Sequence, residues 1–148
     1  EDYAQVSESY RALGMPVELR AFFDDVPARL ASAHLLICRA GASTVSELAA
    51  AGRPAILVPL PNSIDDHQMA NAKALEAAGG GWVLPESQLS STSLAAKLQA
   101  VLEQPETLQR AAEAAGHAGR RDAAERLADL VVTLLPAETR REMREGSH

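Results

Sequence analysis

The sequence is poor in cysteine and in aromatic residues. One of its 148 residues is a cysteine, Cys38, and aromatic side chains make up 3% of the chain. A single cysteine excludes an internal disulfide and a zinc site built from cysteines. Cys38 stands at the end of a predicted strand, where we expect a small buried hydrophobic residue. With so few aromatic residues, the core has to be built from Ala, Leu and Val.

Several other features are missing from the sequence. It has no apolar run of membrane-spanning length and no signal peptide, so we expect a cytoplasmic protein. The net charge of −6 argues against nucleic acid as a partner and against strong anchoring on anionic lipid. Neither a dinucleotide fingerprint nor a P-loop is present, and no cluster of metal ligands or paired carboxylates stands out. We therefore predict no cofactor and no metal site.

The composition is that of an ordinary globular domain, with 47% hydrophobic and 23% charged residues. We predict one domain over residues 1–135 and a charged tail over residues 136–148. The chain starts at Glu1 inside a predicted helix, and it finishes with EGSH, which resembles a remnant of cloning. These ends indicate a piece of a longer protein.

Strand and helix signals alternate along the chain. Predicted strands cover residues 16–22, 34–38, 55–59 and 81–84, and predicted helices cover residues 1–14, 24–33, 44–51 and 65–79. Residues 90–135 read as two or three helices broken near Pro105 and residues 116–119. We expect Asp24 to be the N-cap of its helix. The pattern predicts an α/β, Rossmann-like parallel sheet with helical crossovers, followed by C-terminal helices.

Ligands of such sheets bind beyond the carboxyl ends of the strands, where three loops meet, residues 23–24, 39–44 and 60–68. The second loop belongs to the stretch CRAGASTVSELAAAG, which holds Arg39 and the small-residue turn 41–44. This turn lets a ligand approach the backbone, and the free N–H groups of the following helix favour an anion such as phosphate. An alternative is structural, because Thr44 and Glu47 have the spacing of a capping box.

The third loop opens a helix with the sequence DDHQMANA. His67, Gln68 and Asn71 lie within one turn of each other near its N-terminus. Side chains that both donate and accept hydrogen bonds suit sugar hydroxyls. The alternative is that Asp65 or Asp66 caps the helix and that His67 is solvated.

These two blocks, together with the weaker block RAFFDDV, resemble the carboxyl-terminal half of the MurG-type glycosyltransferases over residues 1–130. These bacterial GT-B enzymes transfer N-acetylglucosamine from UDP to undecaprenyl-diphospho-muramoyl-pentapeptide, which converts lipid I to lipid II in peptidoglycan synthesis. The resemblance implies an inverting, metal-independent hexosyltransferase of cell wall biogenesis, and hence a role in cell shape and division. It also implies a peripheral position on the inner face of the cell membrane.

The resemblance implies roles for nine residues. Phe23 would recognise the uracil edge through its backbone, with Phe22 beside it, and Glu47 would bind both ribose hydroxyls. Ala42, Ser43 and Thr44 would receive the diphosphate. His67 and Gln68 would hold the hydroxyls of N-acetylglucosamine, and Asn71 would support the loop. Some members have Gln at the position of His67.

The family's GGSxG loop and its amino-terminal domain, which brings the lipid-linked acceptor and the proposed catalytic histidine, do not occur in this sequence. The resemblance therefore implies the donor-binding half, short of its first strands, with no catalytic residue of its own. We expect a sheet edge open to association. Alternatives are another GT-B enzyme, such as a diacylglycerol glycosyltransferase or a UDP-N-acetylglucosamine 2-epimerase, and a non-catalytic sugar-nucleotide-binding subunit.

Overall fold

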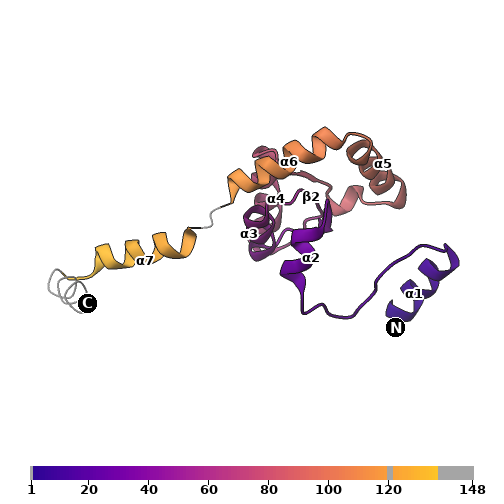
Figure 1. Cartoon of the computed structure of the whole chain (residues 1–148), viewed down its shortest axis with the longest axis horizontal. Helices are drawn as coiled ribbons and strands as arrows, with labels where there is room; N and C mark the ends of the chain where they lie inside the picture. The colour runs from indigo at the N-terminus through magenta and orange to yellow at the C-terminus, as the bar shows by residue number, and fades with distance from the viewer. Residues whose placement is uncertain (1, 120–121, 137–148) are drawn as a thin grey trace. The chain divides into compact units, whose positions relative to one another are not determined.

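The computed structural model describes residues 2–119 and 122–136 (Figure 1). Its contacts divide the chain into two compact units, Glu1–Ser32 and Ala33–His148. Most of the predicted charged tail, residues 137–148, lies outside the described residues. None of the helices within the described ranges combines the length and the apolar character needed to cross a membrane.

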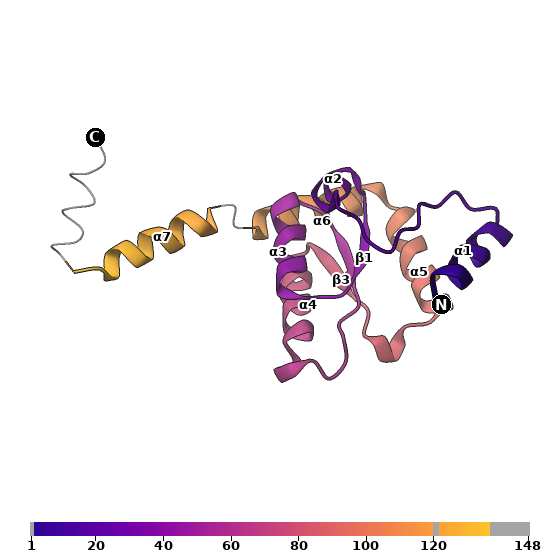
Figure 2. The same cartoon turned by 90° about the horizontal axis from the view of Figure 1, so that it is seen from below.

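The second unit is built on a parallel sheet of three strands. The strands β1 (Leu36–Cys38), β2 (Ala55–Leu57) and β3 (Gly81–Val83) lie side by side in this order. Leu36 pairs with Ala55, which in turn pairs with Gly81. The crossovers are α3 (Ala42–Ala51) and α4 (His67–Ala77), which lie next to each other in Figures 1 and 2. The predicted α/β class with helical crossovers is confirmed.

The middle strand forms the centre of the core. All three residues of β2 are buried, as the continuous apolar run predicts for a strand covered on both faces. Ile56 and Val58 pack with Leu84 on one face, where Leu94 and Leu98 of α5 (Ser91–Leu102) also lie. Leu57 alternates with them and faces the other side of the sheet.

The remaining helices confirm the predicted breaks. After α5 follow α6 (Pro105–Ala118), which packs against α3, and α7 (Ala123–Leu134). Two short 3-10 helices, η1 (Ile64–Asp66) and η2 (Glu86–Gln88), follow the ends of β2 and β3. Gly52 ends α3 as predicted, because its φ of 62° is left-handed and its N–H bonds back to Ala49.

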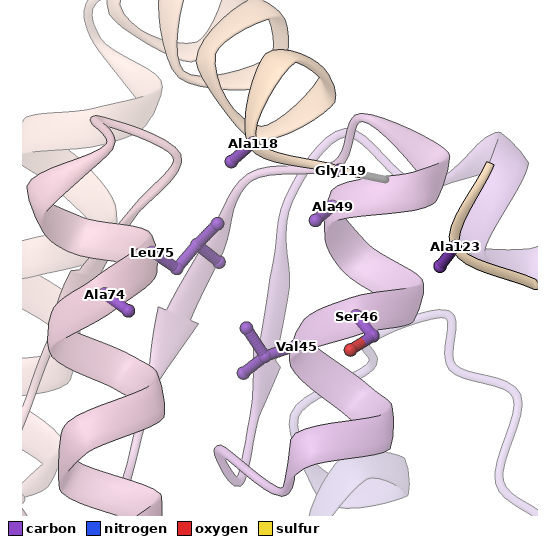
Figure 3. Close-up of a pocket in the computed structure, with 8 residues that line it drawn as sticks. All are labelled: Val45, Ser46, Ala49, Ala74, Leu75, Ala118, Gly119 and Ala123. Carbon is purple, nitrogen blue, oxygen red and sulfur yellow. The ribbon is translucent and has the colours of Figure 1, made fainter. Parts of the chain in front are cut away.

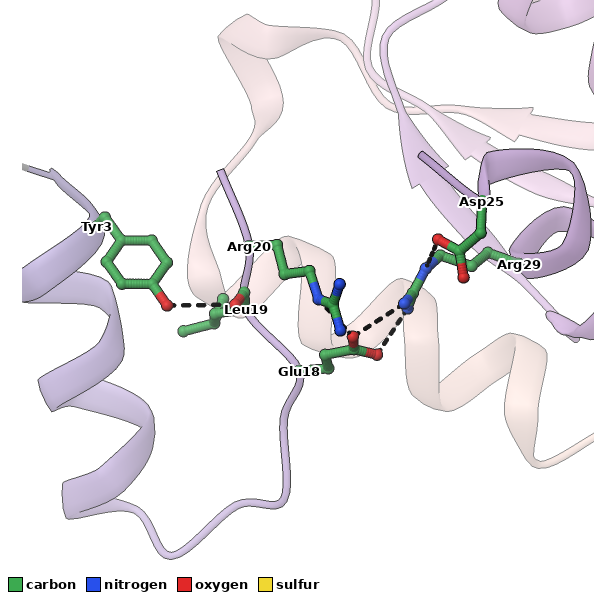
Figure 4. Close-up of polar contacts among 6 residues, drawn as sticks. All are labelled: Tyr3, Glu18, Leu19, Arg20, Asp25 and Arg29. Carbon is green, nitrogen blue, oxygen red and sulfur yellow. Dashed lines mark hydrogen bonds and ion pairs between the residues drawn. The ribbon is translucent and has the colours of Figure 1, made fainter. Parts of the chain in front are cut away.

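The first unit corrects one prediction. Residues 16–22 form no strand, because no other described segment pairs with them. Side chains hold this segment instead (Figure 4). The Tyr3 hydroxyl of α1 (Asp2–Ala12) donates to the Leu19 carbonyl at 3.2 Å, and Glu18 accepts two bonds from Arg29 at 2.7 and 2.9 Å.

The helix α2 (Val26–Ser32) begins later than predicted. The Asp25 carbonyl accepts the first helical bonds, from the Ala28 and Arg29 N–H groups, so Asp25 and not Asp24 takes the N-cap position. Arg29 also pairs with the Asp25 carboxylate at 2.7 Å, and its guanidinium lies 3.9 Å from the centre of the Phe23 ring. The hydrogen bonds from Arg29 lower the pKa of Asp25 and of Glu18.

Candidate functional site at the carboxyl ends of the strands

The three parallel strands end at the same edge of the sheet, at Cys38, Leu57 and Val83. The chain that leaves this edge forms the loops 39–41, 58–63 and 84–85. Seven of the nine predicted site residues lie in the helices that follow the first two loops. They are Ala42, Ser43, Thr44 and Glu47 of α3, and His67, Gln68 and Asn71 of α4.

The start of α3 leaves its first backbone donors open. Gly41 is the N-cap and makes no side-chain cap, and the first helical bond runs from the Val45 N–H to the Gly41 carbonyl at 3.0 Å. The helix begins two residues earlier than predicted, so Thr44 is its third residue. The structural alternative, in which Thr44 caps the helix and forms a capping box with Glu47, is therefore contradicted. Glu47 is exposed.

The loop before α4 has unusual backbone conformations. Asn62, Asp65 and Asp66 have φ angles of 57°, 50° and 54°, which are left-handed values. Asn and Asp tolerate this region better than other residues, but it still costs conformational free energy. Asp66 occupies the N-cap position of α4, as one alternative held, although its side chain makes no capping bond. Such residues concentrate at sites where function fixes the backbone.

The side chain of Gln68 connects the loop after β1 with the loop after β2. Its Oε1 accepts hydrogen bonds from the Leu60 N–H at 3.0 Å and from the Ala40 N–H at 3.3 Å. Both partners are donors, so the amide can have only one orientation, with its oxygen towards them. The side-chain oxygen of Gln68 is thus bound within the protein, and only the Nε2 of this side chain remains to donate to a ligand.

Asn71 also binds Ala40, in the loop after β1. Its Nδ2 donates to the Ala40 carbonyl at 3.1 Å, and Ala40 is completely buried. Both backbone polar groups of Ala40 are therefore satisfied by α4 side chains. A buried peptide without partners is costly, so these two bonds fix the start of α3 relative to α4.

The other predicted residue of α4, His67, points into solvent. Its side chain is 68% exposed, and its Nε2 lies 3.7 Å from the Asp65 carboxylate. This distance is too long for a hydrogen bond. His67 is therefore free to turn towards a ligand.

Arg39 and Glu86 form a contact that sequence reasoning missed. The Nη1 of Arg39 pairs with the Glu86 carboxylate and also donates to the carbonyls of Val58 and Pro59, at 3.3 and 3.4 Å. The sequence places Arg39 in the loop after β1. Nothing in it signals Glu86, which is 47 positions away.

A cavity of the described residues lies away from these loops. It has a volume of about 510 Å³ between α3, α4 and the end of α6 (Figure 3). The side chains that line it are apolar except for that of Ser46, and none of the nine predicted residues is among them. The lining residues are Val45, Ser46, Ala49, Ala74, Leu75, Ala118, Gly119 and Ala123.

Phe22 and Phe23, the remaining two predicted residues, belong to the first unit. Phe22 is 80% exposed, which is unusual for a large apolar side chain. Phe23 is half-buried beneath the Arg29 guanidinium. Within the described ranges, no group of three or more His, Cys, Asp or Glu residues could hold a metal ion.

The chain matches the family described as "Glycosyltransferase family 28 C-terminal domain" over residues 1–127. This match covers the first unit, most of the second and all nine predicted residues. A solved structure described as "Crystal structure of acinetobacter baumannii MurG" is similar with a TM-score of 0.83 and 31% identity. The alignment covers 90% of this chain and 41% of that structure.

Two curated relatives carry the name UDP-N-acetylglucosamine–N-acetylmuramyl-(pentapeptide) pyrophosphoryl-undecaprenol N-acetylglucosamine transferase. The protein of Rhodospirillum rubrum is 56% identical over 131 residues, which are 88% of this chain and 34% of that protein. The protein of Paramagnetospirillum magneticum is 53% identical over 139 residues, which are 94% of this chain and 38% of that protein. The chain thus spans little more than a third of these relatives.

Proposed function

This chain belongs to the glycosyltransferase family 28 C-terminal domain family, and on that premise we propose that it is the donor-binding part of an N-acetylglucosamine transferase. The donor is UDP-N-acetylglucosamine. The acceptor is the lipid-linked muramyl-pentapeptide that the names of the relatives describe. The product would be the lipid-linked disaccharide precursor of peptidoglycan.

The observation that carries this proposal is the open start of α3. The N–H groups of Ala42, Ser43 and Thr44 precede the first intrahelical bond, and the N-cap residue, Gly41, has no side chain that could accept from them. A helix N-terminus with free donors binds phosphate through these N–H groups and through the helix dipole. It lies at the carboxyl edge of a parallel sheet, where nucleotides bind in this class of fold.

We assign the remaining parts of the donor to other residues. Glu47 lies one turn further along α3 and is exposed, so its carboxylate can accept bonds from both ribose hydroxyls. The backbone of Phe23, with Phe22 beside it, would recognise the uracil. These assignments follow the family motif position by position.

The sugar would bind at the first turn of α4. Because the oxygen of Gln68 is occupied, Gln68 donates from Nε2 to a sugar hydroxyl and cannot also accept from a second one. His67, which is exposed, supplies a further contact. Asn71 serves the site by holding Ala40, and with it the start of α3.

We propose that the acceptor binds to a part of the protein that this chain does not cover, since the relatives are nearly three times as long as the matched segment. The lipid of the acceptor would place the reaction at the cytoplasmic face of the membrane. We expect the 148-residue chain to bind the donor and to show no transfer by itself.

The test is a thermal-shift panel on the 148-residue chain with UDP-N-acetylglucosamine, UDP-glucose, UDP and GDP. A ligand that binds the native state raises the unfolding midpoint by mass action. We expect the largest shift for UDP-N-acetylglucosamine, a smaller one for UDP and none for GDP. Equal shifts for UDP and GDP, or none for any nucleotide, would contradict the proposal.

A further inference from the structure

The loops at the carboxyl edge carry one permanent cation. Residues 39–41, 58–66 and 84–90 contain Arg39 and no other Lys or Arg. The same segments, which include η1 and η2 as well as the loops, contain three carboxylates, those of Asp65, Asp66 and Glu86. Glu47 adds a fourth carboxylate from α3. An anionic ligand at this edge therefore meets a mostly negative surface with a single source of full positive charge.

Arg39 is anchored in a way that leaves part of its guanidinium available. Its bonds to Val58, Pro59 and Glu86 all come from Nη1. Its Nε and Nη2 make no hydrogen bond to any described residue of the chain. Its side chain is 48% exposed, so these N–H groups are accessible to a ligand.

The position of Arg39 fits a ligand on α3. It lies two residues before the N-cap Gly41, and its guanidinium reaches across the edge to the carbonyls that follow β2. Neighbouring strands are about 4.8 Å apart. The guanidinium therefore lies at the end of β2, next to β1, the strand that leads into α3.

A diphosphate needs more positive charge than α3 supplies. The helix dipole is equivalent to about half an elementary charge and acts over the first turn only. Charge-assisted bonds from a guanidinium to phosphate oxygens are about twice as strong as neutral ones. Glu86, which pairs with the same guanidinium, offsets its charge in the absence of a ligand.

We propose that Arg39 is a further donor-binding residue, which contacts the diphosphate through Nε and Nη2, and that Glu86 competes with the diphosphate for it. This inference rests on the proposed function. The bonds of Nη1 to the loop carbonyls hold the guanidinium in place during the exchange. The pair thus sets the affinity of the site for the nucleotide diphosphate rather than for the nucleoside.

The experiment compares UDP with uridine, which lacks the diphosphate, by NMR titration of the isotope-labelled 148-residue chain. Arg39→Ala should weaken UDP binding about tenfold or more and leave uridine binding unchanged. Arg39→Lys should recover part of the loss. Arg110→Ala on α6 removes the same charge away from these loops and should leave both affinities unchanged.

Glu86→Gln gives the decisive result, because it should tighten UDP binding about threefold by removing the competing charge. Glu106→Gln on α6 is its matched control and should have no effect. A protein in which Glu86 merely supports the fold would bind UDP more weakly after this change. Glu86→Gln also tests the inference if Arg39→Ala does not fold.

Three results would overturn the inference alone: UDP affinity unchanged in Arg39→Ala, equal losses for UDP and uridine, or weaker or unchanged UDP binding in Glu86→Gln. A wild-type chain that binds neither UDP nor UDP-N-acetylglucosamine would instead overturn the proposed function, and the inference with it.

Discussion

The loops after β1 and β2 leave the same edge of the sheet, but they hold their shapes differently. The loop after β1 has three residues, 39–41, and an ordinary backbone, with a φ of −59° at Gly41. The loop after β2, residues 58–63, continues into η1, and together they have left-handed φ angles at Asn62, Asp65 and Asp66. The shorter loop leads to open backbone donors, and the longer one leads to the side chains of α4.

The difference shows how the site is assembled. The loop after β1 is held in place by α4, because Gln68 and Asn71 bind both backbone polar groups of Ala40. The loop after β2 carries the strain that places these two side chains. The position of the start of α3 therefore depends on the more strained loop. Substitutions in α4 should alter the start of α3 as well.

The strongest test of this dependence is Gln68→Ala. It removes the acceptor of two backbone N–H groups, one of them on the buried Ala40, so we expect the free energy of unfolding to fall by about 2–3 kcal/mol. Gln68→Glu keeps an acceptor oxygen and should cost less than about 1 kcal/mol. Urea unfolding measures both changes. Equal losses in the two variants would show that Oε1 does not hold the loops.

Glu47→Gln on α3 tests a residue that should affect ligand binding and leave stability unchanged. Glu47 is exposed and takes part in no capping box, so its loss should leave the unfolding midpoint unchanged. In the proposed site its carboxylate binds both ribose hydroxyls, and we expect UDP binding to weaken by about 2 kcal/mol. Calorimetric titration and a thermal scan measure the two quantities. Unchanged affinity with a lower midpoint would contradict the ribose role.

Asn71→Ala should have a smaller effect than Gln68→Ala, because it removes one bond instead of two. We expect a loss of about 1–2 kcal/mol in unfolding free energy, since the buried Ala40 carbonyl loses its donor. Asn71→Asp should cost more than Asn71→Ala, because a carboxylate oxygen would then face that carbonyl. The reverse order in urea unfolding would exclude the hydrogen bond as the source of the effect.

Local patterns in the sequence predicted the sheet and its crossovers. The apolar run of residues 55–59 and the stop at Gly52 depend on neighbouring residues only, and both are confirmed. Residues 16–22 have the composition of a strand but form none, because a strand needs a partner elsewhere in the chain. The alternative with Thr44 as the cap is contradicted because α3 starts at Ala42, two residues before Thr44.

The contacts that hold the candidate site together could not be predicted from local patterns. Gln68 meets Ala40 across 28 positions, and Arg39 meets Glu86 across 47. Neither spacing corresponds to a helix or strand period. These pairs meet only because parallel strands bring distant loops to one edge.

The smallest expected effect concerns the strained loop itself, at Asn62. This exposed residue has a φ of 57°, so glycine should relieve strain at little loss of contact. The gain is partly offset by the greater freedom of glycine in the unfolded chain, and we expect Asn62→Gly to stabilise by about 0.5 kcal/mol. Asn62→Ala should destabilise by about 1 kcal/mol, because its Cβ is disfavoured at this φ and it lacks the polar side chain of Asn. At Ala74, an exposed residue inside α4, the order should be reversed, since Ala74→Gly should cost about 1 kcal/mol. If alanine proved better than glycine at Asn62 as well, the loop after β2 would not be strained there, and its contrast with the loop after β1 would be lost.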